Sequence, residues 1–590
     1  MRIERARTDI LILGTGGAGL FAALHAKQAD PDLDVTIAVK GLVGKCGCTR
    51  MVQGGYNVAL APEDSVERHF MDTIVGGKWL PRQDLAWQLC VKAVERIREL
   101  ENEIGCFFDR NPDGSMHQKA FAGQSFDRTV HKSDLTGIEI INRLMEQVRA
   151  LRVNRLEEHR AIELIPAADG SGISGVLMID MRTGIYRFVQ AKAVLLATGA
   201  GPTMYLYHTP SGDKSCDGLA MALRYGLALR DMEMVQFHPT GLLGGSDTRM
   251  TGTVLEEGLR GAGGYLLNGA KERFMLAIDP AGERATRDIV SRGIYAEMRA
   301  GNTTPMGGVY IAMGHLGPES VAERFPGMVK RCADCGFDLA GGLVEVVPTA
   351  HYMMGGVEFD IDTSTASPGL FAAGEDCGGV HGANRLGGNG VANSTVYGGI
   401  AGETMAAYVK GGAPLRDPEE GIIDAGIARA EMPFALKPGD LPGLRDRLSE
   451  TMWDDIGILR TDEGIVRGMA KLADHQAELL QTGLADGDRA FNLTWHDWLN
   501  LDSLMTVSEV IGTAAAARKD SRGAHFREDF PETGDLETTA YTRITGEDGR
   551  LKLDMVPVTF DIVRPGQSLI DDDAGAPPAA RQADTRPGAA

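Results

Sequence analysis

The stretch Asp9-Ile-Leu-Ile-Leu-Gly14-Thr15-Gly16-Gly17-Ala18-Gly19-Leu20 decides the fold of this chain. Its apolar first half predicts a buried strand, and apolar side chains recur at helical spacing from Leu20 onward. The glycines between them match the pattern GxGxxG. There the first two glycines let backbone N–H groups approach a pyrophosphate at a helix N-terminus, and the third permits close helix packing. A second apolar run over residues 35–39 completes a βαβ unit of the length expected for nucleotide binding.

The overall composition indicates a multidomain enzyme that uses a nucleotide cofactor. The chain has 590 residues, of which 43% are hydrophobic and 24% charged, so we expect two to four domains. Its 76 glycines fall in short clusters beside apolar runs, which is typical of turns that contact a ligand. The net charge of −21 argues against nucleic acid as a partner, because phosphate backbones bind basic surfaces.

The sequence pattern predicts neither a secreted nor a membrane-spanning chain. The first apolar run has about five residues, too short for a signal-peptide core, and no stretch is long enough to cross a bilayer. We expect a cytoplasmic chain that reaches the inner face of a membrane only through a partner. The eight cysteines are irregularly placed, and Cys332 and Cys335 form a CxxC pair without further ligands at metal spacing. We therefore predict no disulfide framework and no metal site.

Apolar patterns further along the chain predict more of the same sheet and a separate helical region. Residues 173–190 read as a hairpin, residues 193–197 as a buried strand, and residues 369–373 as a strand that rejoins the sheet. Two helices are expected near residues 465–479 and 504–517.

The cofactor that the βαβ unit binds is indicated by two distant segments. The second strand ends in Lys40, where a dinucleotide fold usually places an acid for the ribose, and this weakens a generic NAD interpretation. Ala197-Thr198-Gly199-Ala-Gly and Gly369-Leu-Phe-Ala-Ala-Gly-Glu375 resemble the strand-end motifs of two-domain FAD flavoproteins. By this resemblance, Glu375 would hold the ribose.

The predicted fold class is α/β, with an FAD-binding Rossmann-like domain, an inserted α+β capping domain and a C-terminal helical domain. The FAD-binding domain is expected in two parts, at residues 1–235 and 351–425, around a capping domain at 236–350. The helical domain is expected at 426–535 and a C-terminal segment at 536–590, ending in a disordered tail that is low in aromatic residues and rich in Ala and Pro.

Further motifs make the chain similar to one family over nearly its whole length. They are Gln53-Gly54-Gly55, Gln236-Phe-His-Pro-Thr240, Arg260-Gly, His351-Tyr-Met-Met-Gly-Gly356, His381-Gly-Ala-Asn-Arg385-Leu-Gly-Gly-Asn389 and Ser521-Arg-Gly-Ala-His525. The chain thereby resembles the flavoprotein subunits of succinate dehydrogenase and fumarate reductase, and their relative L-aspartate oxidase.

The resemblance implies a site that moves a hydride between FAD and a small dicarboxylate. Fumarate has two carboxylates to grip and a double bond to polarise, and arginine and histidine suit that task. By resemblance, His238, His351 and Arg385 would hold the substrate against the flavin. Arg287 would exchange the proton. Because a guanidinium is nearly always protonated, Arg287 would need a relay, which the resemblance assigns to Glu257 and Arg260.

The remaining site residues are also implied by the resemblance. The cofactor-binding set is Gly14, Gly16, Gly17, Ala18, Gly19, Lys40, Cys48, Thr49, Gln53, Gly54, Gly55, Ala197, Thr198, Gly199, Asp217, Glu375 and Asn389, and the substrate-lining set is Phe108, Gln124 and Glu256. Each residue taken singly has a structural alternative, such as a core histidine, an interface arginine or, for Phe108, a core aromatic. Their joint appearance in matching motifs favours the functional interpretation.

The chain departs from the family pattern after Asn389, where it reads Gly390-Val-Ala-Asn-Ser394, and at two positions that bear on the flavin link and the substrate. In many members a histidine five residues before the Gln-Gly-Gly carries a covalent bond to the flavin, and here that residue is Cys48. We expect non-covalent FAD, with a thioether to Cys48 as the alternative. The family's Thr-Glu pair reads Glu256-Glu257, and a carboxylate facing a substrate carboxylate is repulsive. Glu256 therefore turns away or is protonated, or the substrate presents a neutral or cationic group to it.

The leading hypothesis is an FAD-dependent oxidoreductase acting on CH–CH donors, partnered by an iron–sulfur subunit. The alternative is an oxidase or dehydrogenase for an amine-bearing dicarboxylate such as L-aspartate, acting on CH–NH2 donors. A flavin-binding electron-transfer or assembly subunit with a decayed site is disfavoured, because the six candidate catalytic residues are all present in context. The sequence leaves open the exact substrate, the direction of reaction, the electron partner and the oligomeric state.

Overall fold

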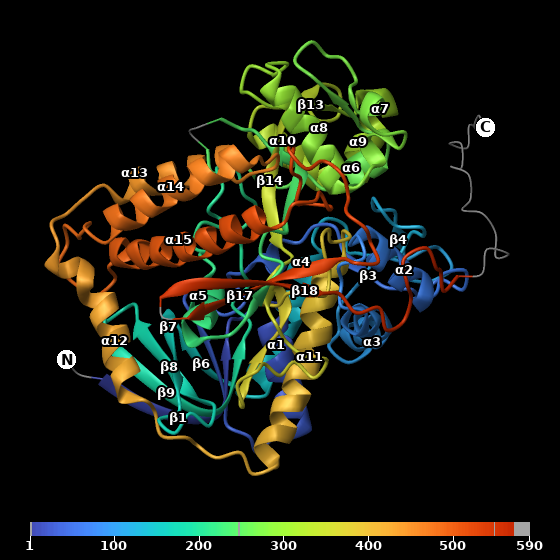
Figure 1. Cartoon of the computed structure of the whole chain (residues 1–590). Helices are drawn as coiled ribbons and strands as arrows, with labels where there is room; N and C mark the ends of the chain where they lie inside the picture. The colour runs from blue at the N-terminus through green and yellow to red at the C-terminus, as the bar shows by residue number, and fades with distance from the viewer. Residues whose placement is uncertain (1–2, 246–247, 548, 571–590) are drawn as a thin grey trace.

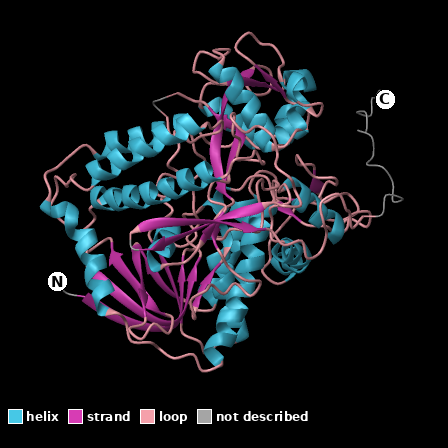
Figure 2. Cartoon of the chain, viewed as in Figure 1, coloured by secondary structure: helices cyan, strands magenta, loops and turns pink. Residues whose placement is uncertain are grey.

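The structure is a computed structural model that describes residues 3–245, 248–547 and 549–570. Figures 1 and 2 show a large sheet with helices against it, a smaller α+β unit above, long helices to one side and a β-hairpin across the middle. No helix within these described ranges is both long enough and apolar enough to cross a membrane.

The large sheet has seven strands in the order β6-β2-β1-β9-β8-β7, with β16 also paired to β9. These strands are β1 (Ile3–Leu13), β2 (Val35–Val39), β6 (Asn154–Glu157), β7 (His159–Pro166), β8 (Ile173–Asp180), β9 (Tyr186–Leu196) and β16 (Leu370–Ala372). The pairs β1–β2, β2–β6, β1–β9 and β9–β16 are parallel, so five strands end at one edge. The predicted hairpin and the strand that rejoins the sheet are confirmed. Ligands of such sheets bind at that carboxyl edge.

Helix α1 (Gly17–Ala29) follows β1 directly and packs against α11 (Asn389–Lys410). The two backbones approach closely because α11 has glycines one turn apart at the contact. A Cβ on Gly398 would lie 2.6 Å from the carbonyl oxygen of Ala18, and one on Gly402 would lie 2.4 Å from that of Ala22. This contact fixes the start of α1, and with it the glycine turn, against the sheet.

The upper unit is built around a four-stranded antiparallel sheet in the order β11-β14-β13-β12. Its elements are β11 (Val235–Leu242), α6 (Gly258–Gly261), β12 (Tyr265–Leu267), α7 (Met275–Ile278), α8 (Arg287–Arg299), β13 (Val309–Ala312), α9 (Pro318–Arg324), α10 (Pro326–Asp334) and β14 (Leu343–Met353). The unit has its own apolar core, and its first and last strands pair with each other. The two chain segments that connect this unit to the rest of the protein therefore lie side by side.

The connections between these parts hold shorter elements. They are β3 (Tyr56–Asn57), α2 (Val66–Gly76), α3 (Gln83–Asn102), β4 (Gln118–Lys119), β5 (Thr129–Val130), α4 (Thr136–Ala150), α5 (Asp217–Tyr225), β10 (Leu229–Arg230) and β15 (Gly356–Val357). The strands β3, β5 and β4 form a small sheet of their own.

The last third of the chain is helical and then returns to β structure. The helices are α12 (Glu420–Glu431), α13 (Leu441–Asp455), α14 (Asp462–Leu479) and α15 (Leu493–Ala517), so both expected helices are present. The strands β17 (Ala540–Glu547) and β18 (Arg550–Pro557) form a hairpin that was not predicted from the sequence, and β17 pairs with β10. The predicted disordered tail, residues 571–590, lies outside the described residues.

Candidate active site

A cavity of about 610 Å³ runs from the carboxyl edge of the large sheet to the strands of the upper unit. Its lining contains most of the expected cofactor-binding residues, namely Gly14, Gly16, Gly17, Ala18, Lys40, Cys48, Thr49, Gln53, Gly54, Gly55, Ala197, Thr198, Gly199, Asp217 and Glu375. It also contains five of the six expected catalytic residues, Arg287, His238, Glu257, His351 and Arg385.

The glycine turn is built for the close approach of an anionic group. Gly14 has φ +107, and a Cβ there would lie 2.1 Å from the carbonyl oxygen of Ala197. Helix α1 has no cap from its own N-cap side chain and no acidic residue in its first turn, so N–H groups of that turn other than the N–H of Gly17, which donates to Thr49, are available to a phosphate. The buried hydroxyl of Thr15 has no hydrogen-bond partner. The turn therefore fits the pyrophosphate of a dinucleotide such as FAD.

The end of β2 carries a buried ion-pair network in place of a single acid. The ammonium of Lys40 donates to Asp217 at 2.7 Å and to Asn500 at 3.2 Å, and Arg160 donates to the second oxygen of Asp217 at 2.6 Å. Burial lowers the pKa of Lys40 to about 8. Burial alone would raise the pKa of Asp217, yet Arg160 and Lys40 hold it below its usual value. Asp217 is thus an ionised carboxylate that Lys40 and Arg160 hold in place at the cavity wall.

Three further expected cofactor-binding side chains of the lining, Glu375, Thr49 and Cys48, come from two segments of the chain. Glu375 accepts a hydrogen bond from the backbone N–H of Met353 at 3.0 Å, and burial raises its pKa to about 7. The Thr49 hydroxyl accepts from the N–H of Gly17 at 3.1 Å. Burial raises the pKa of the Cys48 thiol to about 12, so Cys48 is protonated.

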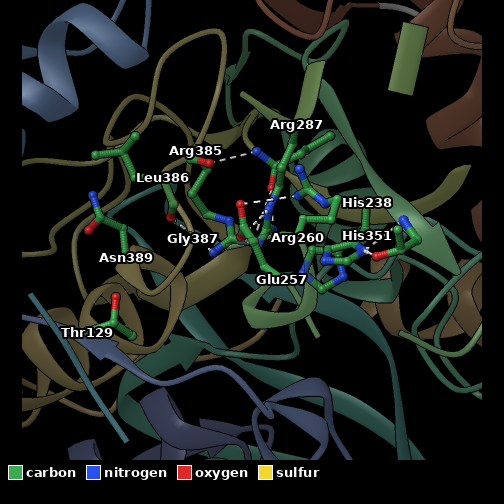
Figure 3. Close-up of polar contacts among 12 residues, drawn as sticks. Thr129, His238, Glu257, Arg260, Arg287, His351, Arg385, Leu386, Gly387 and Asn389 are labelled. Atoms are coloured by element: carbon green, nitrogen blue, oxygen red, sulfur yellow. Dashed lines mark hydrogen bonds and ion pairs between the residues drawn. The ribbon is translucent and has the colours of Figure 1, made fainter. Parts of the chain in front are cut away.

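The polar cluster at the far end of the cavity is centred on Arg287, the first residue of α8 (Figure 3). Its Nε and Nη2 donate to one oxygen of Glu257, at 3.0 and 2.6 Å, and its Nη1 donates to Gln236 at 3.1 Å. Arg385 donates from Nη2 to the same oxygen of Gln236 at 3.1 Å. Gln236 therefore holds two guanidinium groups side by side. Gln236 belongs to the motif Gln236-Phe-His-Pro-Thr240, but no role for it was predicted from the sequence.

Arg385 is a buried cation with unused hydrogen-bonding capacity. Burial, followed by repulsion from Arg287, lowers its pKa to about 10, which still leaves it charged near neutral pH. Its guanidinium lies 4.3 Å from the ring centroid of Tyr352, and its Nε has no hydrogen-bond partner. A buried N–H without a partner is costly, and a carboxylate ligand would satisfy it.

Two histidines complete the cluster, one on β11 and one on β14. The ring centroids of His238 and His351 are 5.4 Å apart, because these strands pair directly. Nδ1 of His351 contacts the hydroxyl of Thr209 at 2.8 Å. Burial and then nearby Arg287 lower the pKa of both imidazoles well below the usual value, so both are neutral.

The electrostatics of the cluster favour a small dianion. Burial would raise the pKa of Glu257, but Arg287 and Arg260 keep it below its usual value, so Glu257 is ionised. The carboxylate of Glu257 is shared between these two arginines. Arg385 has no carboxylate partner among the ion pairs of the described residues, so the cluster is left with positive charge. Two carboxylates of a ligand can be met by the arginines and by histidine N–H groups.

Several expected site residues do not line the cavity. Arg260 lies behind Glu257, at 3.4 Å from it, which suits a relay position. Gly19 packs against Gly14, and a Cβ on Gly19 would lie 2.0 Å from the carbonyl oxygen of Gly14. Asn389 lies apart from the cluster (Figure 3), and its Oδ1 accepts from His69 at 2.9 Å if the histidine Nε2 carries the proton.

The expectation that Phe108 and Gln124 line the substrate pocket is not met. Phe108 is buried in the main apolar core, the structural alternative noted for it. Gln124 donates to Asn57 at 3.0 Å and to the carbonyl oxygen of Gly387 at 2.9 Å, so it supports the loop that carries Arg385. Among the described residues, the phenylalanine that lines the cavity is Phe121, and the ring of Tyr352 lines it as well. No residue-level signal distinguished Phe121 from Phe108, because the direction of each ring is set by packing.

Glu256 lines the cavity, but it has a positive partner. Its carboxylate accepts a hydrogen bond from the ammonium of Lys119 at 3.1 Å. Lys119 was not identified from the sequence, because 137 residues separate it from Glu256.

Comparison with known proteins agrees with this geometry. A family model described as an FAD binding domain matches residues 9–391, and one described as the C-terminal part of the fumarate reductase flavoprotein matches residues 445–579. One subunit of the CoM/CoB fumarate reductase of Methanothermobacter marburgensis is 38% identical over 90% of this chain and 96% of its own. The fumarate reductase flavoprotein subunit of Escherichia coli is 33% identical over 97% of this chain and 98% of its own.

A solved chain of Escherichia coli quinol fumarate reductase, 32% identical, superposes with a TM-score of 0.89 and covers 96% of this chain and 99% of that one. The fold and site thus define an FAD-dependent oxidoreductase. The chain belongs to the succinate dehydrogenase and fumarate reductase flavoprotein family.

Proposed function

We propose that this protein interconverts succinate and fumarate, or closely similar dicarboxylates, at the cluster around Arg287. The observation that carries the proposal is the pair of guanidinium groups of Arg287 and Arg385 on Gln236, with an unpartnered Nε on Arg385 that a carboxylate would satisfy. The relatives of this chain that are named fumarate reductases support the same substrate class. FAD bound in the cavity would supply the hydride acceptor or donor.

Each polar side chain has a proposed task. Arg385, His238 and His351 bind the carboxylates, with the neutral imidazoles acting as N–H donors. Arg287 gives or takes the proton on the carbon next to the hydride position. Because Glu257 is ionised and bridges Arg287 to Arg260, the proton can be replaced without a long-lived neutral guanidine.

We propose that the unit at residues 236–350 acts as the cap over the substrate and that residues 1–235 and 351–425 hold FAD. His238 and His351 support this division, because they lie on the two strands that connect the cap to the sheet. Residues 426–535 form the proposed helical domain, and residues 536–590 the C-terminal segment.

We further propose that FAD is held without a covalent bond. The support is the Cys48 thiol, whose pKa of about 12 disfavours the thiolate that a thioether linkage would need. The glycine turn and the buried network around Lys40 provide non-covalent contacts in its place.

An iron–sulfur partner subunit is proposed as the electron partner. Relatives are named as subunits of fumarate reductases, and the described residues of this chain hold no group of three or more side chains placed to bind a metal ion. The assembly is proposed to be cytoplasmic, meeting a membrane at its inner face through the partner.

The test is a half-reaction that needs no partner. The purified protein with bound FAD is photoreduced without oxygen, fumarate is added, and the return of oxidised-flavin absorption is followed. Prompt return with fumarate supports the proposal. Reduced flavin that is reoxidised by oxygen but not by fumarate would contradict the proposal. The amine-bearing alternative predicts instead that L-aspartate reduces the oxidised flavin, although the Lys119 partner of Glu256 weakens its basis.

A further inference from the structure

Glu256 stands on the wall between two cavities. A second cavity of about 460 Å³ lies beside the first, and both Glu256 and Asp134 line the two of them. Glu256 is 5% exposed and is the residue directly before Glu257, the partner of Arg287. A free carboxylate at this position would oppose the binding of a dianionic ligand, because like charges in a poorly solvated site repel strongly.

Lys119 is the group placed to remove that repulsion. It lies on the short strand β4, and its ammonium donates to Glu256 at 3.1 Å with a side chain only 18% exposed. The same ammonium lies 5.9 Å from the ring centroid of Phe121, which lines the first cavity. Lys119 itself lines the second cavity. The ion pair therefore draws the Glu256 carboxylate toward the second cavity.

Two other charged groups that face Glu256, Asp134 and Arg331, act on it in opposite directions. The pKa of Glu256 is raised overall, because burial has the largest effect; Lys119 opposes burial most strongly, Asp134 raises the pKa further and Arg331 lowers it. Asp134 precedes α4, and Arg331 lies on α10. Lys119 is the only one of these groups that hydrogen-bonds the Glu256 carboxylate among the described residues.

We propose that Lys119 is a positioning residue that neutralises Glu256 and turns it from the substrate, so that the Lys119–Glu256 pair decides whether the pocket accepts a dicarboxylate. The proposal rests on the proposed function. It assigns specificity to a pair outside the arginine and histidine cluster, and it explains how a glutamate can occupy a wall of a dianion site.

The test measures the binding of malonate, a dicarboxylate without a CH–CH bond to oxidise, to the FAD-loaded protein by calorimetry. Lys119→Met leaves Glu256 without its nearest cation. A unit charge at close range in a partly buried site corresponds to roughly tenfold to hundredfold weaker binding of a dianion at pH 8. The pKa of Glu256 rises when its cation is removed, so the carboxylate is protonated at low pH. The loss should therefore shrink toward pH 5.5 and grow as pH rises.

Three further variants separate charge from structure. Lys119→Arg should bind malonate like the wild type, because it restores the ion pair. Lys119→Met combined with Glu256→Gln should recover binding to within about threefold, because no unpaired charge remains. Lys132→Met removes a lysine that pairs with Asp109 at 2.9 Å and lines neither cavity, and it should change nothing.

The outcomes keep the two proposals distinct. Equal malonate affinity of wild type and Lys119→Met at every pH would overturn the role of Lys119, as would a double variant that binds no better than Lys119→Met. Failure of the wild type itself to bind malonate or to oxidise its reduced flavin with fumarate would instead overturn the proposed function.

Discussion

Replacing Arg287 with lysine should separate its charge from its geometry. The guanidinium makes two hydrogen bonds to Glu257 and one to Gln236, whereas the single ammonium of a lysine can keep the ion pair and one bond. The loss of hydrogen bonds should cost about 1–3 kcal/mol of stability. Turnover should fall by about 10²–10⁴-fold, the range for loss of a positioned acid. FAD content should not change, because the glycine turn is untouched.

The assay is stopped-flow reoxidation of photoreduced flavin by fumarate, with flavin content and thermal unfolding measured on the same samples. Arg273→Lys is a matched control, since Arg273 also donates from Nε, at 2.9 Å, and from Nη2, at 2.6 Å, to the two oxygens of one glutamate, Glu283, and does not line the cavity. The control should lose stability without losing turnover. Turnover of Arg287→Lys within tenfold of wild type, or an equal loss in the control, would refute the reasoning.

Three other perturbations test the cofactor site. Gly14→Ala should lower FAD content at least about tenfold, because the new Cβ would lie 2.1 Å from the Ala197 carbonyl oxygen and the backbone has φ +107. The control Gly212→Ala has open space around its Cβ and should retain FAD. Equal FAD content in both variants would contradict this prediction. Acid precipitation should release all flavin, and the chain mass should lack an added FAD; flavin that stays with the chain, and is released after Cys48→Ala, would show a thioether instead. The pKa of Glu375 is about 7 in the folded protein against 4.5 as its ordinary value, so folding binds a proton and stability falls as pH rises through 7. Glu375→Gln should therefore make the cofactor-free protein more stable than wild type at pH 8, by roughly 1–3 kcal/mol after allowance for partial exposure, and no more stable at pH 4.5 in denaturant melts.

The cofactor half of the site was readable from the sequence because its signals are local. The turn from Gly14 to Gly19 joins a strand to a helix within a few residues, and its glycine requirement follows from backbone geometry alone. The apolar run that rejoins the sheet at residues 369–373 was readable for the same reason. The candidate catalytic arginines and histidines came from motif resemblance, and the structure brings them to one cluster.

The hairpin β17–β18 shows what local patterns cannot reveal. Polar and apolar residues alternate from Arg550 to Met555, which is a local strand signal, but the partner strand β10 lies about three hundred residues earlier. The local pattern therefore cannot reveal which edge the hairpin joins, because that pairing is set by tertiary structure.

By itself, the sequence determined that the chain binds a dinucleotide at a strand–turn–helix junction and that its polar motifs match a dicarboxylate site. Only the tertiary structure decided that Gln236 joins Arg287 to Arg385, that Phe121 rather than Phe108 lines the cavity, and that Lys119 meets Glu256. The physical reason is how far apart in the sequence the interacting residues lie. Backbone turns are fixed by neighbours in sequence, whereas the direction of a side chain and the neutralisation of a buried charge are fixed by segments that only folding brings together.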